Sequence, residues 1–470
     1  MRANWTEKTS ATLCPSAAKS RSWQQSERRS RSLRARGDPR VPRLDRTAHR
    51  RGAGPETRRA GFCRAGARAG RINHRRRHRR GTGVRRVLGQ YRAVDPAFRS
   101  PDQPVLCRLG PQPRGAEFRR GAWRGGNLCR QLGRRCGRHP RGNQTLRWIA
   151  DLAGWPASAG GVFVAGGTLG NLSALHAARE WHRRNRPGEG RGAIHCSSEA
   201  HSSIQAVARV MDVAVIVVEA DETGRMTAQA AIPHLTEAVF AIVANGGATN
   251  CGAVDDIAGL ADLAQEHGLW LHVDGAYGGA ALADPAMRPA FDGIERADSL
   301  IVDPHKWLFA PYDSCALLYR DAGHGAAAHG QQAVYLDTAD KTHWNPSDYA
   351  LHLTRRARGL PLWYSLAVHG TEAYAEAIAT TRQVAEDIAK GIDATPGLDL
   401  LLGPQLTVIL FRPQNMDEAE MIAWGETHRR SGALLCLPTR WRGEMVFRLC
   451  IVNPATRADE VLAILETLTR

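Results

Sequence analysis

The chain has 470 residues, of which 43% are hydrophobic and 23% are charged. This length and composition are typical of a globular protein of two or three domains with a large buried core. A mean hydropathy of −0.37 and the lack of any apolar run near the about 20 residues that a membrane helix needs exclude a membrane-spanning protein. The formal net charge of +18 would ordinarily suggest an acidic partner, but residues 1–150 carry +31 and the remainder carries −13.

The basic excess comes from residues 1–145, which are rich in arginine, glycine, proline and serine and nearly free of lysine. Without apolar periodicity this segment cannot bury enough surface to offset its chain entropy, so its composition predicts disorder. Three interpretations stay open: a nucleic-acid-binding arm, a solvated tail, or translation of a GC-rich gene in a wrong reading frame. We favour the third, because an off-frame reading of GC-rich DNA yields Arg, Gly, Pro and Ala with few lysines.

The ten cysteines form no CxxC pair and no Cys/His spacing that would suggest a metal site or a disulfide framework. The first residues, MRANWTEKTS, contain no apolar core of a secretion signal. Scattered thiols are typical of a reducing compartment. We therefore expect a cytoplasmic protein with no metal site.

From residue 146 onward, short apolar segments alternate with helical patterns, which is typical of an α/β protein with a mostly parallel sheet. The predicted strands cover residues 161–164, 192–195, 213–218, 238–243, 269–274, 299–302 and 315–319. Helices are predicted over 171–183, 202–211, 257–267 and, as one long helix, 360–390. Apolar segments at 406–411 and 446–451, around a helix over 417–430, predict a small α+β domain. We expect a large domain over 146–360 and a small domain over 361–470.

A glycine-rich turn, AGGTLGN, follows the first predicted strand and opens a helix. Glycine lets backbone N–H groups approach an anion, and a helix N-terminus adds a partial positive charge. Gly167 and Thr168 are therefore candidates for holding a phosphate, with the Thr168 hydroxyl as a further donor. Such a turn is also common as a purely structural connection, so by itself it does not establish a phosphate site.

Two later strands end in side chains that can do chemistry. LWLHVDGAYGG places Asp274 at the carboxyl edge of the sheet, where it can pair with a protonated ring nitrogen or simply cap the next helix. SLIVDPHKWLFAPYD places Lys306 after a buried strand among apolar residues, which favours a neutral amine that can form a Schiff base. An anion-binding turn, a carboxylate for a pyridine nitrogen and an amine for an aldehyde are together what pyridoxal phosphate needs.

His201 opens the helix predicted in SSEAHSSIQAVARVM. A planar imidazole can stack on a pyridine ring and act as an acid or base, although a histidine at a helix start is more often a capping or solvated residue. Six segments, one of which contains His201, resemble motifs of the group II pyridoxal-phosphate-dependent amino acid decarboxylases in order and spacing. This is the family of aromatic L-amino acid and glutamate decarboxylases. They are GVFVAGGTLGNLSALHAARE, SSEAHSSIQA, ATNCGAVDDI, LWLHVDGAYGG, ADSLIVDPHKW and LTRRARGLPLW.

The resemblance implies the fold-type I architecture of pyridoxal-phosphate-dependent transferases, a homodimer and specific residue roles. Lys306 resembles the Schiff-base lysine, Asp274 the partner of the pyridine nitrogen and His201 the residue stacked on the ring. Tyr335 resembles a loop tyrosine that protonates the substrate carbon after CO2 leaves. Further cofactor contacts are expected from Gly167, Thr168, Thr249, Ala276, Asp303 and His305.

The implied activity is pyridoxal-phosphate-dependent decarboxylation of an L-amino acid to the amine and CO2, with an aromatic substrate suggested by family frequency. A transaminase or lyase of the same fold is the nearest alternative. An inactive chain whose basic beginning binds nucleic acid nonspecifically is an alternative of another class, although neither nucleic acid nor membrane is an expected partner. Ala248, Gly275 and Pro361 depart mildly from the family pattern, and the family's N-terminal helices have no counterpart in residues 1–145, which favours the wrong-frame interpretation.

Overall fold

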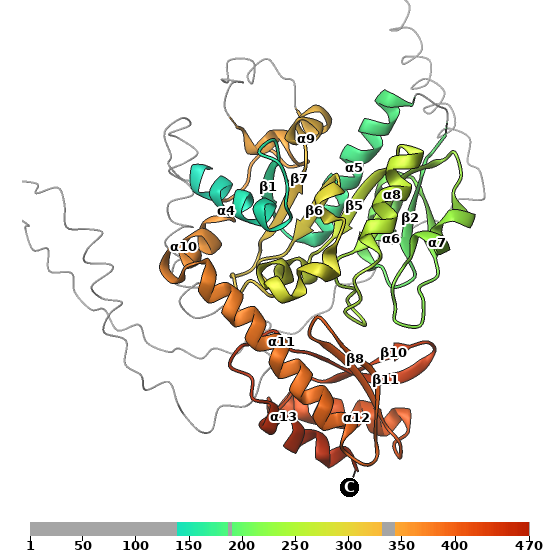
Figure 1. The fold of residues 1–470 in the computed structure, drawn as a ribbon, viewed down its shortest axis with the longest axis vertical. Coiled ribbons are helices and arrows are strands. Elements are labelled where there is room, and N and C mark those ends of the chain that lie inside the picture. The colour runs from blue at the N-terminus through green and yellow to red at the C-terminus, as the bar shows by residue number, and fades with distance from the viewer. Residues whose placement is uncertain (1–138, 187–189, 331–343, 470) are drawn as a thin grey trace, which may run out of the picture. The chain divides into compact units, whose positions relative to one another are not determined.

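The computed structural model describes residues 139–186, 190–330 and 344–469 (Figure 1). Most of the Arg-rich segment 1–145, for which disorder is predicted, lies outside this part. For residues 139–145 the prediction is wrong, because they form the start of helix α4 (His139–Leu152). The apolar pattern predicts a helix start at Leu146, so α4 begins earlier than predicted. Its first turns carry polar residues that the pattern does not register, and the Thr145 hydroxyl there donates to the Arg141 carbonyl at 3.3 Å.

Within the described residues, seven strands form one sheet in the order β1-β7-β6-β5-β4-β2-β3. Their bounds are β1 Gly160–Val164, β2 Ala193–Ser197, β3 Ala214–Val218, β4 Val239–Asn245, β5 Trp270–Asp274, β6 Ser299–Val302 and β7 Cys315–Tyr319. Strand β7 is antiparallel to its neighbours β1 and β6, and the other pairs are parallel. The prediction of a mostly parallel seven-stranded sheet in an α/β fold is therefore confirmed.

Helices cover both faces of this sheet (Figure 1). Helices α5 (Gly167–Asn185), α6 (Ser203–Met211) and α9 (Ala322–His329) share one buried core with the side chains on one face. Helix α4, the short α7 (Ala228–Ala231) and α8 (Ile257–His267) share a second core on the other face. Burial on both faces explains why strands β1, β2, β4, β5, β6 and β7 appear in the sequence as continuous apolar runs. The edge strand β3 is equally apolar but only partly buried.

The single helix predicted over 360–390 is in fact two helices, α10 (Leu360–His369) and α11 (Thr371–Asp393). The break lies at Gly370, whose φ of 82° is in the left-handed region that ends a right-handed helix. The prediction of one continuous helix is wrong because the apolar pattern runs on through the glycine.

Helix α11 leads from the large domain into the small one (Figure 1). Tyr374 and Ile378, in its first half, belong to a core of the large sheet, whereas Ala385 and Ile388 belong to the core of the small domain. A domain division between residues 360 and 361 stays a prediction, since this helix contributes to both cores.

Within residues 398–469, four strands form an antiparallel sheet in the order β10-β11-β9-β8. The elements are β8 Leu398–Gln405, β9 Val408–Pro413, α12 Glu418–Ser431, β10 Leu437–Trp441, β11 Glu444–Cys450 and α13 Ala458–Leu465. The predicted small α+β domain is confirmed, but β8 and β10 escape prediction because they are mostly half-exposed and carry no long apolar run. Across all the described ranges, no helix combines the length and apolarity needed to cross a membrane.

His329 joins three elements of the large domain. Its Nε2 lies 3.0 Å from the Ser173 carbonyl of α5 and 3.2 Å from the Tyr319 hydroxyl of β7, and the ring lies 5.0 Å from that of His176. Burial and, to a smaller extent, the neighbouring His176 lower the pKa of His329 from 6.5 to about 4. The folded protein therefore holds this ring neutral at pH values at which the unfolded chain protonates it.

The free energy of unfolding should consequently fall as the pH is lowered from 6.5 toward 4, because the unfolded state binds more protons in this window. For His329 alone the slope is at most about 1.4 kcal/mol per pH unit. The variant His329→Gln should show a shallower slope in urea titrations at a series of pH values. An identical slope in both proteins would show that His329 does not titrate between the two states.

Candidate active site

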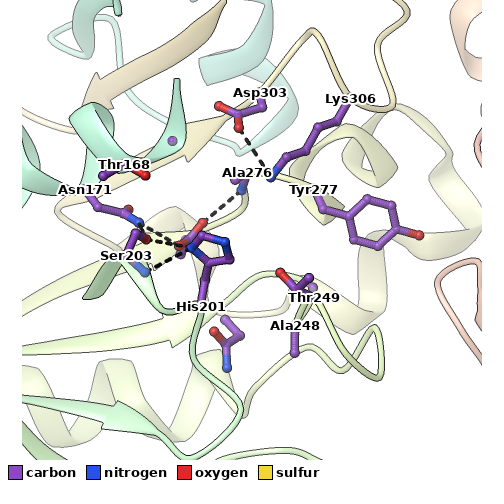
Figure 2. Close-up of a pocket in the computed structure, with 14 residues that line it drawn as sticks. Thr168, Asn171, His201, Ser203, Ala248, Thr249, Ala276, Tyr277, Asp303 and Lys306 are labelled. Atoms are coloured by element: carbon purple, nitrogen blue, oxygen red, sulfur yellow. Dashed lines mark hydrogen bonds and ion pairs between the residues drawn. The ribbon is translucent and has the colours of Figure 1, made fainter. Parts of the chain in front are cut away.

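Strands β1, β2, β4, β5 and β6 run in one direction, so their carboxyl ends meet at one edge of the sheet, the edge where α/β proteins bind ligands. A cavity of about 220 Å³ opens there. Figure 2 shows side chains from separate elements converging on it. The cavity is lined by Gly167, Thr168, Asn171, His201, Ser203, Asn245, Gly247, Ala248, Thr249, Asp274, Ala276, Tyr277, Asp303 and Lys306.

Most of the site residues predicted from sequence line this one cavity. They are Gly167, Thr168, His201, Thr249, Asp274, Ala276, Asp303 and Lys306. The topology brings them together from positions up to about 140 residues apart, from Gly167 to Lys306. Their predicted chemical roles stay predictions, but their convergence is a property of the fold.

His305 lies next to this cavity and not in its lining. Its Nδ1 lies 2.5 Å from the Ser314 carbonyl oxygen, and its Nε2 lies 3.7 Å from the Asp303 carboxylate. The ring also contacts that of Tyr312, with 5.0 Å between centroids. A direct contact between His305 and the cofactor stays a prediction. In the structure, His305 contacts Asp303, which itself lines the cavity. Tyr335, the predicted proton donor, lies outside the described residues.

The N-terminus of α5 reaches the cavity because glycines allow it to approach the sheet. A side chain at Gly170 would place its Cβ 2.8 Å from Ile301 Cγ2 and 3.0 Å from Cys315 Sγ. A Cβ at Gly167 would meet the Asp303 carboxylate at 3.1 Å. The first turn of this helix therefore presents its free backbone N–H groups and the Thr168 side chain to the cavity, which makes it suitable for a phosphate.

Asp274 ends strand β5 and is 8% exposed. Its Oδ2 accepts a hydrogen bond from Asn171 Nδ2 at 2.8 Å, and its Oδ1 accepts one from the Ala276 N–H at 3.2 Å. Two donors on different oxygens hold the carboxylate in one orientation. A buried carboxylate fixed in this way can pair with a cationic ring nitrogen that enters the cavity.

Lys306 extends from the loop after β6 toward Asp303 (Figure 2), and its Nζ lies 3.3 Å from Asp303 Oδ2. The neighbouring Trp307 and Leu308 are buried, as the sequence indicates. The amine itself is not in apolar surroundings, because it is ion-paired and its side chain is 33% exposed. The expectation of an apolar environment therefore holds for its neighbours and is wrong for the amine.

His201 lies on the approach to α6 and is exposed at the cavity. Its Nδ1 accepts from the Ser203 backbone N–H at 3.1 Å and lies 2.8 Å from Ser203 Oγ. These contacts on one ring nitrogen fix the plane of the imidazole. The opposite edge of the ring stays available to a ligand.

Sequence reasoning missed six lining residues: Asn171, Ser203, Asn245, Gly247, Ala248 and Tyr277. Two of them carried a usable signal. Asn171 lies four residues after Gly167 and so on the same face of α5, and Asn245 ends a fully buried strand as Asp274 does. Ser203 and Gly247 carried no comparable signal.

Asn245 and Asp255 fix the end of strand β4. The Asn245 backbone N–H donates to Asp255 Oδ2 at 2.6 Å, and the Met226 N–H donates to Asp255 Oδ1 at 2.8 Å. Burial raises the pKa of Asp255 to about 7, while the two backbone hydrogen bonds act in the opposite direction. The Asn245 side chain, which is 4% exposed, is left to face the cavity.

Tyr277 connects the cavity to the small domain. Its ring stacks on Trp307 with 5.2 Å between centroids, and its hydroxyl lies 2.5 Å from Thr407 Oγ1, in the turn between β8 and β9. The same hydroxyl accepts from the Thr407 N–H at 3.3 Å. The position of Tyr277 in the cavity wall therefore depends on the position of the small domain.

Gly170→Ala should lower the free energy of unfolding by about 1–3 kcal/mol, because the new methyl group overlaps Ile301 and Cys315. The matched control is Gly142→Ala in α4, where a Cβ meets nothing within 4 Å. That variant should be neutral or up to about 1 kcal/mol more stable, because alanine has the higher helix propensity. Denaturant unfolding of both variants tests the close approach of α5, and equal effects would argue against it.

Comparisons with known proteins agree with this geometry. Residues 142–414 match the model of the pyridoxal-dependent decarboxylase conserved domain. An aromatic-L-amino-acid decarboxylase of Bacillus atrophaeus is 32% identical over 342 residues, which are 68% of this chain and 70% of that protein. Human cysteine sulfinic acid decarboxylase is 33% identical over 294 residues, 57% of this chain and 58% of that protein.

Among solved structures, mouse CSAD superposes with a TM-score of 0.62 at 28% identity, covering 70% of this chain and 75% of the mouse chain. These matches confirm the predicted fold type, the predicted cofactor, pyridoxal phosphate, and the predicted class of enzyme, an amino acid decarboxylase. The chain belongs to the pyridoxal-dependent decarboxylase family.

Proposed function

We propose that this chain converts an L-amino acid to the corresponding amine and CO2, using pyridoxal phosphate held on Lys306. The observation that carries the proposal is the meeting of three groups in one cavity: the N-terminus of α5, the Asp274 carboxylate and the Lys306 amine. Each group matches one part of the cofactor, namely its phosphate, its pyridine nitrogen and its aldehyde.

The cavity lining offers a suitable group for each polar part of the cofactor. A Cβ at Gly167 would meet Asp303 Oδ2 at 3.1 Å, so the glycine keeps the first turn of α5 open to a phosphate. The Asp274 carboxylate and the Lys306 amine line the same cavity. The residues present therefore fit pyridoxal phosphate.

Each residue contributes a separate physical effect. The α5 N-terminus and Thr168 would bind the phosphate, and Lys306 Nζ would hold the aldehyde carbon. Asp274 would keep a proton on the pyridine nitrogen, and His201 would cover one face of the ring. When bound, pyridoxal phosphate supplies an electron sink for the carbanion that remains as CO2 departs. A protonated ring nitrogen strengthens that sink, so the orientation of Asp274 bears directly on rate.

We further propose an aromatic L-amino acid as substrate, supported by the name of the Bacillus atrophaeus relative. A homodimer in the cytoplasm is part of the same proposal. The homodimer is the assembly that the resemblance to the decarboxylase family implies. Sedimentation of the full chain tests the dimer.

Borohydride reduction of the purified protein with pyridoxal phosphate should attach the cofactor to the peptide that contains Lys306. Lys306→Ala should abolish the labelling and reduce amine formation by at least about 1,000-fold, because no other described amine lines the cavity. Lys390→Ala, which alters a lysine that is 72% exposed on α11, is the control and should label as the wild type does. Labelling at another lysine would contradict the proposed role of Lys306.

Product analysis separates decarboxylation from the alternative of a transaminase. With aromatic L-amino acids, the wild-type protein should release CO2 and amine in equal amounts and form no keto acid. Keto acid without CO2 would favour a transaminase. The release of CO2 only from acidic or diamino acids would support decarboxylation but contradict the proposal of an aromatic substrate.

A further inference from the structure

A continuous chain of hydrogen bonds lies behind Asp274. Trp270 Nε1 lies 2.8 Å from Ser299 Oγ, which lies 2.8 Å from His272 Nδ1. His272 Nε2 lies 2.9 Å from Asn171 Oδ1, and Asn171 Nδ2 lies 2.8 Å from Asp274 Oδ2. All five side chains are buried. The proposed function uses only the last of them.

The direction of every hydrogen bond in this chain follows from its two ends. The indole N–H of Trp270 can only donate, and the carboxylate of Asp274 can only accept. Because Asp274 accepts from Asn171 Nδ2, the Asn171 Oδ1 atom faces His272 Nε2 and must accept a proton from it. A neutral imidazole protonated on Nε2 has a bare Nδ1, so Ser299 donates its proton to Nδ1 while its oxygen accepts from Trp270.

The other tautomer of His272 breaks this arrangement. With its proton on Nδ1, the ring would present a bare Nε2 to Asn171 and turn the amide so that its oxygen faced Asp274. Two oxygens that can only accept would then lie within 3 Å of each other without a proton between them. A cationic ring is also disfavoured, because burial lowers the pKa of His272 to about 4, although Asp274 acts in the opposite direction.

The same amide of Asn171 reaches the second group in the cavity. Its Nδ2 carries two protons, and besides Asp274 it lies 3.1 Å from Ser203 Oγ. Ser203 Oγ lies 2.8 Å from His201 Nδ1. Because the Ser203 hydroxyl accepts from Asn171, its own proton is free to go to His201. The orientation of one amide therefore sets both Asp274 and the imidazole of His201. Figure 2 shows Asn171, Ser203 and His201 next to one another at the cavity.

We propose that His272, as the neutral Nε2–H tautomer, and Asn171 are positioning residues that together fix the orientation of Asp274 and His201 toward the cofactor. Neither carries out a chemical step. The proposal rests on the proposed function for the roles of Asp274 and His201, but the tautomer and the direction of the hydrogen bonds follow from the described contacts alone.

The first experiment measures pyridoxal phosphate affinity and the visible absorbance of the bound cofactor in His272→Leu. Leucine removes the donor to Asn171, whose amide can then rotate and leave Asp274 without an N–H donor. The dissociation constant should rise about 10-fold to 100-fold, and the pH at which the absorbance maximum changes should shift. Thermal unfolding of the cofactor-free chain is recorded in parallel.

Two matched variants separate positioning from packing. His272→Gln retains a side-chain N–H near the place of Nε2 and should recover most of the affinity. His195→Leu removes another fully buried histidine, on strand β2, whose Nε2 lies 2.9 Å from the His234 carbonyl and which does not line the cavity. That variant should lose stability to a similar degree while its cofactor affinity and absorbance remain those of the wild type.

Other outcomes would overturn the proposal. If His272→Leu binds pyridoxal phosphate with the affinity and absorbance of the wild type and only its melting temperature falls, His272 contributes to packing and not to positioning. Equal losses in His272→Gln and His272→Leu would show that the donor is not what matters. A similar loss in His195→Leu would show that any buried histidine of the sheet has the same effect.

A readout that needs no cofactor is the ¹⁵N spectrum of histidine-labelled protein. The resonance missing in His272→Gln should be that of a neutral ring protonated at Nε2, and a ring protonated at Nδ1 or at both nitrogens would overturn the inference. If the wild-type chain takes up no pyridoxal phosphate, the proposed function fails, and this spectrum by itself decides the hydrogen-bond assignment.

Discussion

The buried carboxylate of Asp274 is the group on which the arrangement of the site depends. A carboxylate removed from water is costly unless donors satisfy it, and Asp274 receives two, from Asn171 Nδ2 and the Ala276 N–H. The first donor is itself held from behind by His272. The need to satisfy one buried charge thus organises the first turn of α5, the interior of β5 and the start of α6 into a single polar network within an otherwise apolar sheet.

The sheet makes this network possible by bringing strand ends together. Parallel β4, β5 and β6 deliver Asn245, Asp274 and Asp303 to neighbouring positions at one edge. Gly170 lets α5 lie against β6 closely enough for the helix N-terminus to reach that edge. The small domain contributes from a distance through the contact between Thr407 and the Tyr277 hydroxyl. The position of the cavity wall and the seating of the small domain are therefore coupled.

Much of the fold and the site could be predicted from sequence because the information is local. Strands buried on both faces form apolar runs, and Asp274, Lys306 and His201 lie at the end of such a run or within four residues of it. Prediction failed where local pattern and backbone geometry disagree. At Gly370 a left-handed residue divides an apolar pattern into two helices, and the half-exposed strands β8 and β10 carry no long apolar run.

The sequence by itself indicated the seven strands of the large sheet in chain order, the sheet class and Lys306, Asp274 and His201 as candidates for one site, because hydrophobic periodicity and motif spacing are local properties of the chain. Only the tertiary structure decided which distant residues share a hydrogen bond. Asn171 and His272 lie 101 positions apart, and nothing in the local sequence of either indicates the other. Their pairing exists because α5 packs across β5, which brings an amide and an imidazole together where neither can bond to water.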